Sequence, residues 1–287
     1  MKNYVQLTKP SIMLLVIITG ATALIIEGSL LSQPFKFFLV LLALYLTGGS
    51  ANALNQYFER DIDAKMSRTS KRRPLPQGKI GPASALIFSI LIGITGVLIF
   101  GFVFNWFTAM LSLATILFYS LFYTLFLKPN TAQNIVIGGI AGAMAPVGAW
   151  AAATGRTDIV PWILFLIVFL WTPPHFWALA LFYKDDYYKS KLPMMPVVKG
   201  DDITLRQIVF YSILLVISSI LLFIFHAGWF YLAVALVMGS RFILKSIQAS
   251  RQRTEKNFRG LFGYSIAYLF ILFFAIVIDD FIQRVLL

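Results

Sequence analysis

The chain contains no cysteine and few charged residues. Without cysteine it can hold no disulfide, no thiolate nucleophile, no cysteine-ligated zinc and no covalently attached c-type haem. Charged residues make up only 13% of its 287 residues, whereas apolar residues make up 59% and the mean hydropathy is +0.81. This balance excludes an ordinary soluble globular protein and predicts a protein of the lipid bilayer.

Negative charge is also scarce, since 24 lysines and arginines stand against 12 acidic residues and give a net charge of +12. A basic chain can indicate nucleic-acid binding, but that requires a basic patch on a water-exposed surface. Here the charges only separate apolar segments. We therefore expect no nucleic-acid partner and assign the basic residues to the loops of a membrane protein.

Nine stretches are long and apolar enough to cross the hydrocarbon core of a bilayer, which takes about 20 residues in a helix. They cover residues 11–28, 36–56, 82–103, 107–127, 133–154, 160–183, 207–226, 228–248 and 260–281. Very short turns after the third and seventh stretches require antiparallel hairpins. The sequence predicts an all-α polytopic membrane protein, with residues 1–287 forming a single domain of about nine transmembrane helices around a central cavity.

The basic residues predict the orientation of the chain. If the N-terminus is cytoplasmic, every basic residue except Lys36, Arg156 and Arg284 falls on the cytoplasmic side, as the positive-inside rule requires. The C-terminus is then external. Most of the acidic residues also fall on the cytoplasmic side, although acidic residues do not set topology. We therefore expect a multi-pass protein of the cell (inner) membrane whose cavity and active site face the cytoplasm.

The second stretch ends in an acidic motif. Asn55, Glu59 and Asp63 recur at i, i+4 and i+8, which places them on one helix face over about 12 Å. Oxygen ligands so arranged suit Mg²⁺, which takes a few carboxylates and leaves its other positions to phosphate and water. Amides and carboxylates in the last turns of an apolar span are costly unless they line a polar cavity. This favours a binding site over a merely solvated helix end.

Basic residues follow this motif, including Arg68 and Arg73. They could neutralise a phosphate group, or they could simply be the topology charges of a cytoplasmic loop, which is the ordinary role of such a run. Lys128, at the end of the fourth stretch, has the same two interpretations.

The sixth stretch ends in a second acidic motif, with Asp185 and Asp186 before a proline-rich loop. Acids from two helix ends that meet across a cavity would let Mg²⁺ bridge both sides of a diphosphate. Within this stretch Pro173 and Pro174 predict a kink, and His175 follows it directly. A lone buried histidine is more often a satisfied structural group than a ligand, so both roles stay open for His175.

Three segments together resemble a known family. They are NQYFERDIDAKMSRTSKRRPLP, YTLFLKPNTAQNIVIGGIAGAMAPVGAW and WTPPHFWALALFYKDDYYKSKLPMMPVVKG. The first is similar to the first aspartate-rich motif of the UbiA-type intramembrane prenyltransferases, and the other two are similar to the branch of that family that farnesylates haem. The resemblance covers essentially the whole chain, and nine spans is the usual number in the family.

The resemblance implies transfer of a farnesyl group from farnesyl diphosphate to a vinyl group of haem b, with addition of water, giving haem O and diphosphate. Mg²⁺ would be the cofactor, haem b would be a substrate, and the product could pass to haem A synthase or a terminal oxidase. The catalytic and metal-binding residues would be Asn55, Glu59, Asp63 and Asp186. The substrate-binding residues would be Arg68, Arg73, Lys128 and Asp185, with Trp171 and His175 at the haem.

Three positions depart from the pattern of the wider family. Gln56 and Glu59 stand where aspartate is usual, and both replacements are typical of the haem-farnesylating branch. SKLP at residues 190–193 stands where a small residue and a glycine are common, which leaves the geometry of that loop open. Three other functions compete with haem farnesylation, namely prenylation of an aromatic quinone precursor, transport, and noncatalytic carriage of haem or lipid in which the acids are structural. The WTPPHFW segment argues against the first, and the scarcity of polar residues in the outer loops argues against the second.

Overall fold

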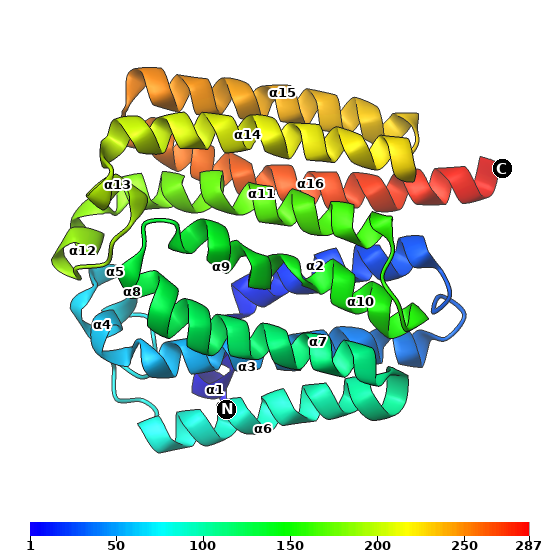
Figure 1. Cartoon of the computed structure of the whole chain (residues 1–287), viewed down its shortest axis with the longest axis horizontal. Helices are drawn as coiled ribbons and strands as arrows, with labels where there is room; N and C mark the ends of the chain where they lie inside the picture. Colours follow the sequence, from blue (N-terminus) through cyan, green and yellow to red (C-terminus); the bar gives the residue numbers. More distant parts are fainter. Residues whose placement is uncertain (287) are drawn as a thin grey trace.

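The computed structural model describes residues 1–286, and the side chains of all of them except Arg68 and Leu286. Within this range the chain forms helices and no β-strand (Figure 1). Nine helical segments of the described residues are long and apolar enough to cross a membrane. They are α2 (Pro10–Glu27), α3 (Pro34–Phe58), α6 with η1 (Pro82–Phe104), α7 to α8 (Trp106–Asn130), α9 with α10 (Asn134–Thr154), α11 (Ile159–Phe182), α14 (Gly200–Phe225), α15 (Trp229–Gln252) and α16 (Glu255–Leu286). The predicted all-α polytopic membrane fold is confirmed, whereas the cytoplasmic opening of a central cavity stays a prediction.

Five short helices complete the described chain: α1 (Lys2–Leu7), α4 (Arg60–Lys65), α5 (Ser67–Ser70), α12 (Lys184–Lys189) and α13 (Met195–Val198). Four of them, α4, α5, α12 and α13, gather at one end of the bundle, at the left of Figure 1. We call this the site end. The turns α2–α3, α10–α11 and α14–α15 lie at the opposite end, which we call the far end. Both acidic motifs therefore belong to the same end of the molecule.

The predicted spans agree with the observed helices except at some polar ends. Helix α14 begins at Gly200 rather than near residue 207, and α16 begins at Glu255 rather than near residue 260. Hydropathy marks only the apolar part of a helix, and polar first turns extend it beyond the hydrocarbon core. Both predicted hairpins are present, and α11 stays helical through Pro173 and Pro174.

Two spans contain wide, π-helical turns. Segment η1 (Phe100–Phe104) follows α6 (Pro82–Ile99), and η2 (Phe118–Leu127) follows α7 (Trp106–Leu117) and leads into α8 (Lys128–Asn130). The fifth span is also divided, into α9 (Asn134–Ala143) and α10 (Ala145–Thr154). A π-turn shifts which side chains share a face, and such turns are frequent at functional sites. Neither π-segment can be read from the hydrophobic pattern.

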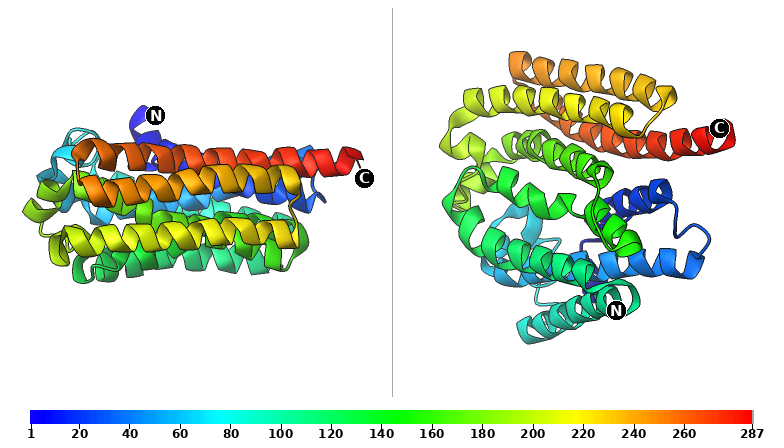
Figure 2. Two further views of the ribbon diagram at one scale, coloured as in Figure 1. Left: turned by 90° about the horizontal axis from the view of Figure 1, so that it is seen from above. Right: turned by 45° about the vertical axis from the view of Figure 1, so that its right-hand side comes forward.

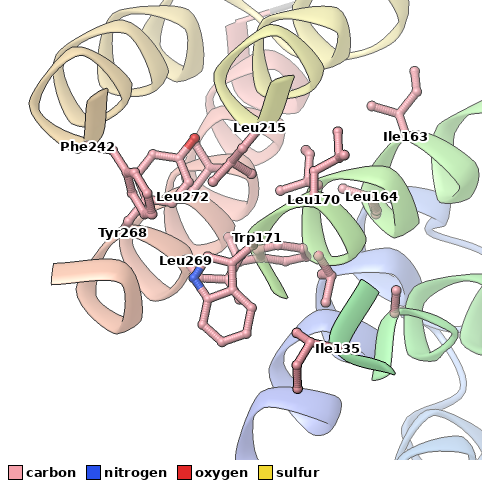
Figure 3. Packing of buried hydrophobic residues seen from close by; sticks show 14 of the residues in the cluster. Ile135, Ile163, Leu164, Leu170, Trp171, Leu215, Phe242, Tyr268, Leu269 and Leu272 are labelled. Carbon is pink, nitrogen blue, oxygen red and sulfur yellow. The ribbon is translucent and has the colours of Figure 1, made fainter. Parts of the chain in front are cut away.

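Helix α11 is the most deeply buried of the nine spans and connects two groups of helices. In Figure 3 its Leu170 and Trp171 lie between Leu269 of α16 and Ile135 of α9. Figure 2 shows α14, α15 and α16 at one side of the bundle and α6 at the other, with α11 between them. The packing of α11 on both sides fixes the position of the second acidic motif, which follows its last turn.

Candidate active site

The first acidic motif lies where α3 passes into α4. The backbone N–H of Glu59 donates to the carbonyl of Asn55 at 3.0 Å, and that of Asp63 donates to the carbonyl of Glu59 at 2.8 Å, so the helical register continues through the junction. The three side chains therefore share one side of the helix, and all three are buried. Asp61 faces away, with 84% of its side chain exposed. The structure thus places these residues in a row, as their spacing predicts.

Two of the predicted basic residues converge on this row from other segments. Arg73, in the loop after α5, forms an ion pair with Asp63 through Nη1, and the same nitrogen lies 3.5 Å from Oε2 of Glu59. Lys128, at the start of α8, forms an ion pair with the other carboxylate oxygen of Glu59. Arg73 and Lys128 are therefore more than topology charges, because a solvated loop would not bring both to the same pair of buried carboxylates.

Lys9 is a third cation of this row, and sequence reasoning missed it. It lies between α1 and α2 with a left-handed backbone (φ 53°), and its Nζ donates to Oδ1 of Asn55 at 2.7 Å. The amide nitrogen of Asn55 in turn donates to Oγ1 of Thr124 at 3.1 Å. A basic residue just before a first span is ordinarily a topology charge. Only the tertiary contact distinguishes Lys9 from such a charge.

Gln56, one of the departures from the family pattern, lies against the N-terminal helix. Its Nε2 donates to the carbonyl of Leu7 at 2.9 Å and to that of Gln6 at 3.2 Å. These are among the last carbonyls of α1, which have no partner within the helix. Gln56 therefore fixes the end of α1, two residues before Lys9, and so positions the Lys9 side chain.

Burial and neighbouring charges shift the pKa values in this row. Burial lowers the pKa of Lys9 well below its ordinary value, and the positive charges of Arg73 and Lys128 act in the same direction. For Glu59, burial favours the neutral acid, but the charges of Lys128 and Arg73 outweigh it and lower the pKa. Burial raises the pKa of Asp63 against the opposing charge of Arg73. Arg73 and Lys128 pair with the two carboxylates, whereas Lys9 is bonded only to an amide oxygen, so a bound polyanion would favour the protonated form of Lys9.

The π-helical segment η2 brings two tyrosines next to the row. Tyr119 and Tyr123 stack with ring centroids 5.0 Å apart, and Thr124, which contacts Asn55, follows them. A Cβ atom at Gly138 of α9 would lie 2.4 Å from the Tyr123 ring, so this close approach requires glycine. In the sequence these aromatic residues cannot be distinguished from ordinary core residues of a span.

The second motif lies next to the first. The hydroxyl of Ser67, on α5, donates to Oδ2 of Asp186 on α12 at 2.6 Å, which links segments more than a hundred residues apart in the sequence. Asp186 is half-buried, whereas Asp185 is exposed. In the loop that follows, Lys191 has a left-handed backbone (φ 55°), the conformation that a glycine there would adopt readily. The chain thus keeps the turn without the glycine.

Arg68 also lies on α5, but its side chain is outside the part of the chain that the structure describes. The two haem candidates lie deeper, on α11. Trp171 Nε1 donates to the carbonyl of Ser265 at 2.7 Å, and the Ser265 hydroxyl lies 2.7 Å from Nδ1 of His175. The His175 ring also stacks between Trp171 and Phe262. Both side chains therefore connect α11 to α16, and no described contact joins them to the acidic row.

The donor set of the row fits Mg²⁺. Among residues 1–286 no three histidine, aspartate or glutamate side chains form a metal cage of their own. Mg²⁺ does not need one, because it is usually held by one or two carboxylates and completes its octahedron with substrate phosphates and water. Glu59 and Asp63 provide two neighbouring carboxylates, and Asn55 provides an amide oxygen. Their cationic partners could then pair with the phosphates.

A family model described as the UbiA prenyltransferase family matches residues 14–277 of the chain. Among curated proteins, the chain is 44% identical over 282 residues to a protein of Synechocystis sp. named protoheme IX farnesyltransferase, covering 97% of this chain and 89% of that protein. It is 45% identical to the protein of the same name from Erythrobacter litoralis, covering 98% and 93% of the two chains.

Solved structures show the same fold at low sequence identity. A structure of digeranylgeranylglyceryl phosphate synthase superposes with a TM-score of 0.80 at 21% identity, covering 97% of this chain and 98% of that one. A UbiA homolog from Archaeoglobus fulgidus, solved with DMAPP and Mg²⁺, superposes with a TM-score of 0.61 at 17% identity, covering 94% and 99%. These similarities extend over the whole bundle rather than over one motif.

Proposed function

The chain belongs to the UbiA prenyltransferase family, and we propose that it transfers a farnesyl group from farnesyl diphosphate to a vinyl group of haem b, with addition of water, giving haem O and diphosphate. The observation that carries the proposal is the identity of 44–45% along nearly the whole chain to proteins named protoheme IX farnesyltransferase. The buried row of acids and cations supports the diphosphate end of the same reaction.

We propose that the diphosphate binds at the site end, between the two motifs. Asn55, Glu59, Asp63 and, from the other side, Asp186 would hold Mg²⁺, which when bound supplies positive charge to the leaving diphosphate. Arg73 and Lys128 would exchange their carboxylate partners for phosphate oxygens. Arg68 would join them from α5, and Lys9, protonated next to the new negative charge, would bind a phosphate oxygen as well.

The chemistry requires no covalent bond to the protein. The bond between C1 of the farnesyl chain and the diphosphate oxygen breaks, and its electron pair leaves with diphosphate. The vinyl group of haem b attacks the allylic carbon, a new C–C bond forms, and water adds to the remaining cationic carbon with loss of a proton. The buried cations of the row would stabilise the charge that develops on diphosphate.

The remaining predicted residues, Trp171, His175 and Asp185, would contribute less directly to the reaction. Trp171 and His175 would shape the wall on the haem side, because their polar atoms are bonded to Ser265 and both faces of the His175 ring are covered. Asp185 is exposed and would assist only from the mouth of the site.

We also propose that the site end faces the cytoplasm and that the product passes to haem A synthase or a terminal oxidase. The absence of cysteine allows a clean test of the orientation. Single cysteines in place of Lys189 at the site end and Ser32 at the far end can be labelled in intact cells with a membrane-impermeant maleimide. We expect position 32 alone to be labelled. Labelling of position 189 alone would show that the site end faces outward instead.

The reaction is tested by incubating membranes that contain the chain with haem b, farnesyl diphosphate and Mg²⁺. Haem O and diphosphate should form together, and a chelator should stop both. Transfer of the prenyl group to an aromatic quinone precursor but not to haem b would support the diphosphate site but show that the acceptor is not haem. Absence of haem O under every condition would exclude haem farnesylation.

A further inference from the structure

Two surface cavities outside the site lie along the seam between α15 and α16. At the site end of this seam lies a cavity of about 280 Å³ between the last turns of α15 and the first turns of α16. It is lined by Lys245, Gln248, Lys256, Asn257, Gly260 and Leu261. Five of these six residues carry a polar side chain or an accessible backbone, and none is acidic. The cavity therefore presents two cations and two amides to whatever enters it.

The same seam becomes apolar towards the far end. A second cavity, of about 240 Å³, is lined only by apolar side chains, among them Phe230, Val234, Ile271, Phe274 and Ile278. The seam thus carries charge at one end and apolar side chains at the other, and it lies on the outer side of the bundle (Figures 1 and 2).

The two cavities lie in line on the same faces of both helices. Lys245 and Val234 are eleven residues apart on α15, and Ile271 and Gly260 are eleven apart on α16, which is close to three full turns. At 1.5 Å per residue the polar and apolar parts are about 16 Å apart along the helices. One leaflet of the hydrocarbon core is about 15 Å thick. The two cavities together have the polarity and the spacing of one lipid molecule. Tyr264 of α16 lies between them, and its hydroxyl donates to the carbonyl of Met238 on α15 at 2.8 Å.

The polar cavity favours an anion over a neutral headgroup. The nearest acidic side chain of α16, Glu255, is paired with Arg259 at 2.7 Å and is not part of the lining. Lys245 and Arg241 both lie 5.6 Å from the centre of the Tyr264 ring, which adds a second basic residue of α15 to the same seam. A Cβ atom at Gly260 would meet nothing within 4 Å, so this position leaves room for the ligand.

We propose that these two cavities together bind one anionic phospholipid of the leaflet at the site end, with its phosphate between Lys245 and Lys256 and an acyl chain that passes over Tyr264 to Ile271 and Phe274. Basic pockets between transmembrane helices attract acidic headgroups, at roughly 1 kcal/mol per basic residue. The apolar second cavity favours a lipid over a soluble phosphate as the ligand, because only a lipid would occupy both cavities. The lipid would hold the last two spans together at the rim of the bundle.

The test compares lipids that differ only in headgroup. The purified full-length chain is exchanged into nanodiscs of equal phosphatidylglycerol and phosphatidylcholine, and the lipids that remain bound after release are counted by native mass spectrometry. The intact chain should prefer phosphatidylglycerol by on the order of thirty-fold, as two basic residues imply. The double variant K245Q/K256Q should lose this preference.

A cavity-filling pair of variants supplies the matched control. Gly260→Leu fills the polar cavity without backbone strain, because the site is open and the helix is regular there. Gly263→Leu is a control on the same helix, since its position is equally open but lies outside the cavity lining. The preference for phosphatidylglycerol should be lost in the first and kept in the second, with equal thermal unfolding temperatures.

Three results would overturn the proposal. They are equal binding of the two lipids by the intact chain, an unchanged preference in K245Q/K256Q, and displacement of the lipid by millimolar inorganic phosphate. The last result would mean that the site binds a free anion and that the apolar second cavity contributes nothing to binding. Because the readout is lipid binding, none of these results depends on farnesyl transfer.

Discussion

Buried carboxylates lie at both ends of the bundle, but the two ends hold them in different ways. Glu59 and Asp63 at the site end and Asp279 and Asp280 at the far end are all less than a tenth exposed. At the site end the partners are side chains from separate segments. At the far end they are mainly backbone groups and neighbours on the same helix. The partners, rather than the burial, separate a binding site from a structural contact.

At the far end Asp279 completes the start of a helix, and Asp280 holds an arginine that reaches the end of another. Asp279 accepts from the backbone N–H groups of Gly228 and Tyr231, which open α15, and Gln283 donates to it at 2.6 Å. Arg284 is bonded to Asp280 at 2.8 Å and also donates to the carbonyl of Ile25 at 2.8 Å, near the end of α2. These two carboxylates are therefore bonded to the backbone and to their own helix rather than to cations from separate segments.

At the site end the partners can be exchanged. Arg73 and Lys128 end long side chains that can turn from a carboxylate to a phosphate oxygen without disturbing a helix. Lys9 has only the amide oxygen of Asn55 as its hydrogen-bond acceptor among the described contacts. A group of side chains with more basic than acidic members is suited to receive an anion.

The largest effect is expected from Asp63→Asn. Loss of this charge should lower the rate of haem O formation by about a hundredfold to a thousandfold, the usual consequence of removing one charge-stabilising group. The protein should still insert and keep its unfolding temperature. Asp61→Asn, two residues away and exposed, is the control and should remain active. Near-normal turnover in Asp63→Asn would remove this residue from the metal site.

Asp279→Ala should have the opposite effect, a loss of stability with unchanged substrate binding. Two backbone N–H groups at the start of α15 would lose their acceptor, and we expect the free energy of unfolding to fall by about 2–4 kcal/mol. Unfolding in detergent measures the loss, while the KM for farnesyl diphosphate of the folded fraction should not change. Asp158→Ala, which removes an exposed cap of α11 at the same end, should cost less, about 1 kcal/mol. A raised KM in Asp279→Ala would contradict the division between the two ends.

Lys9→Gln should raise the KM for farnesyl diphosphate about tenfold, since a hydrogen bond to a charged group contributes roughly 1.5–3 kcal/mol. The KM for haem b should stay the same, and Lys9→Arg should restore part of the loss. Gln56→Leu should give a smaller rise of the same kind, because it only displaces Lys9. Lys2→Gln, on the exposed part of α1, serves as the control. Equal increases for both substrates would indicate a general structural defect.

The smallest expected effect is a pH dependence of stability caused by His226 at the far end. Burial lowers the pKa of His226, although Asp280 acts in the opposite direction. The unfolded chain therefore binds a proton more readily than the folded one, so stability present above the ordinary histidine pKa, about 6.5, declines as the pH falls below it. A loss of less than about 1 kcal/mol is expected between pH 7 and 5.5. Thermal unfolding measured at both pH values checks this loss of stability, and the variant His226→Gln should not show the loss.

Local patterns in the sequence predicted the nine spans and the row of Asn55, Glu59 and Asp63, because hydropathy and a four-residue repeat are properties of neighbouring residues. They did not reveal that Lys9 reaches Asn55 or that Gln56 holds the end of α1. Each of those contacts joins segments more than forty residues apart, and an isolated lysine or glutamine carries no pattern. The roles of Trp171 and His175 were equally hidden, since their bonds to Ser265 belong to another helix.

The sequence by itself determined that this protein lies in the bilayer, which of its segments span it and which of its acids share a face, because backbone hydrogen bonding in lipid allows few alternatives. Only the tertiary structure decided which charges meet. The packing of α3, α8, α11 and the N-terminal segment brings Arg73, Lys128 and Lys9 to one row and places Asp186 beside Ser67. Charges separated along the chain become a site only where folding removes the water between them.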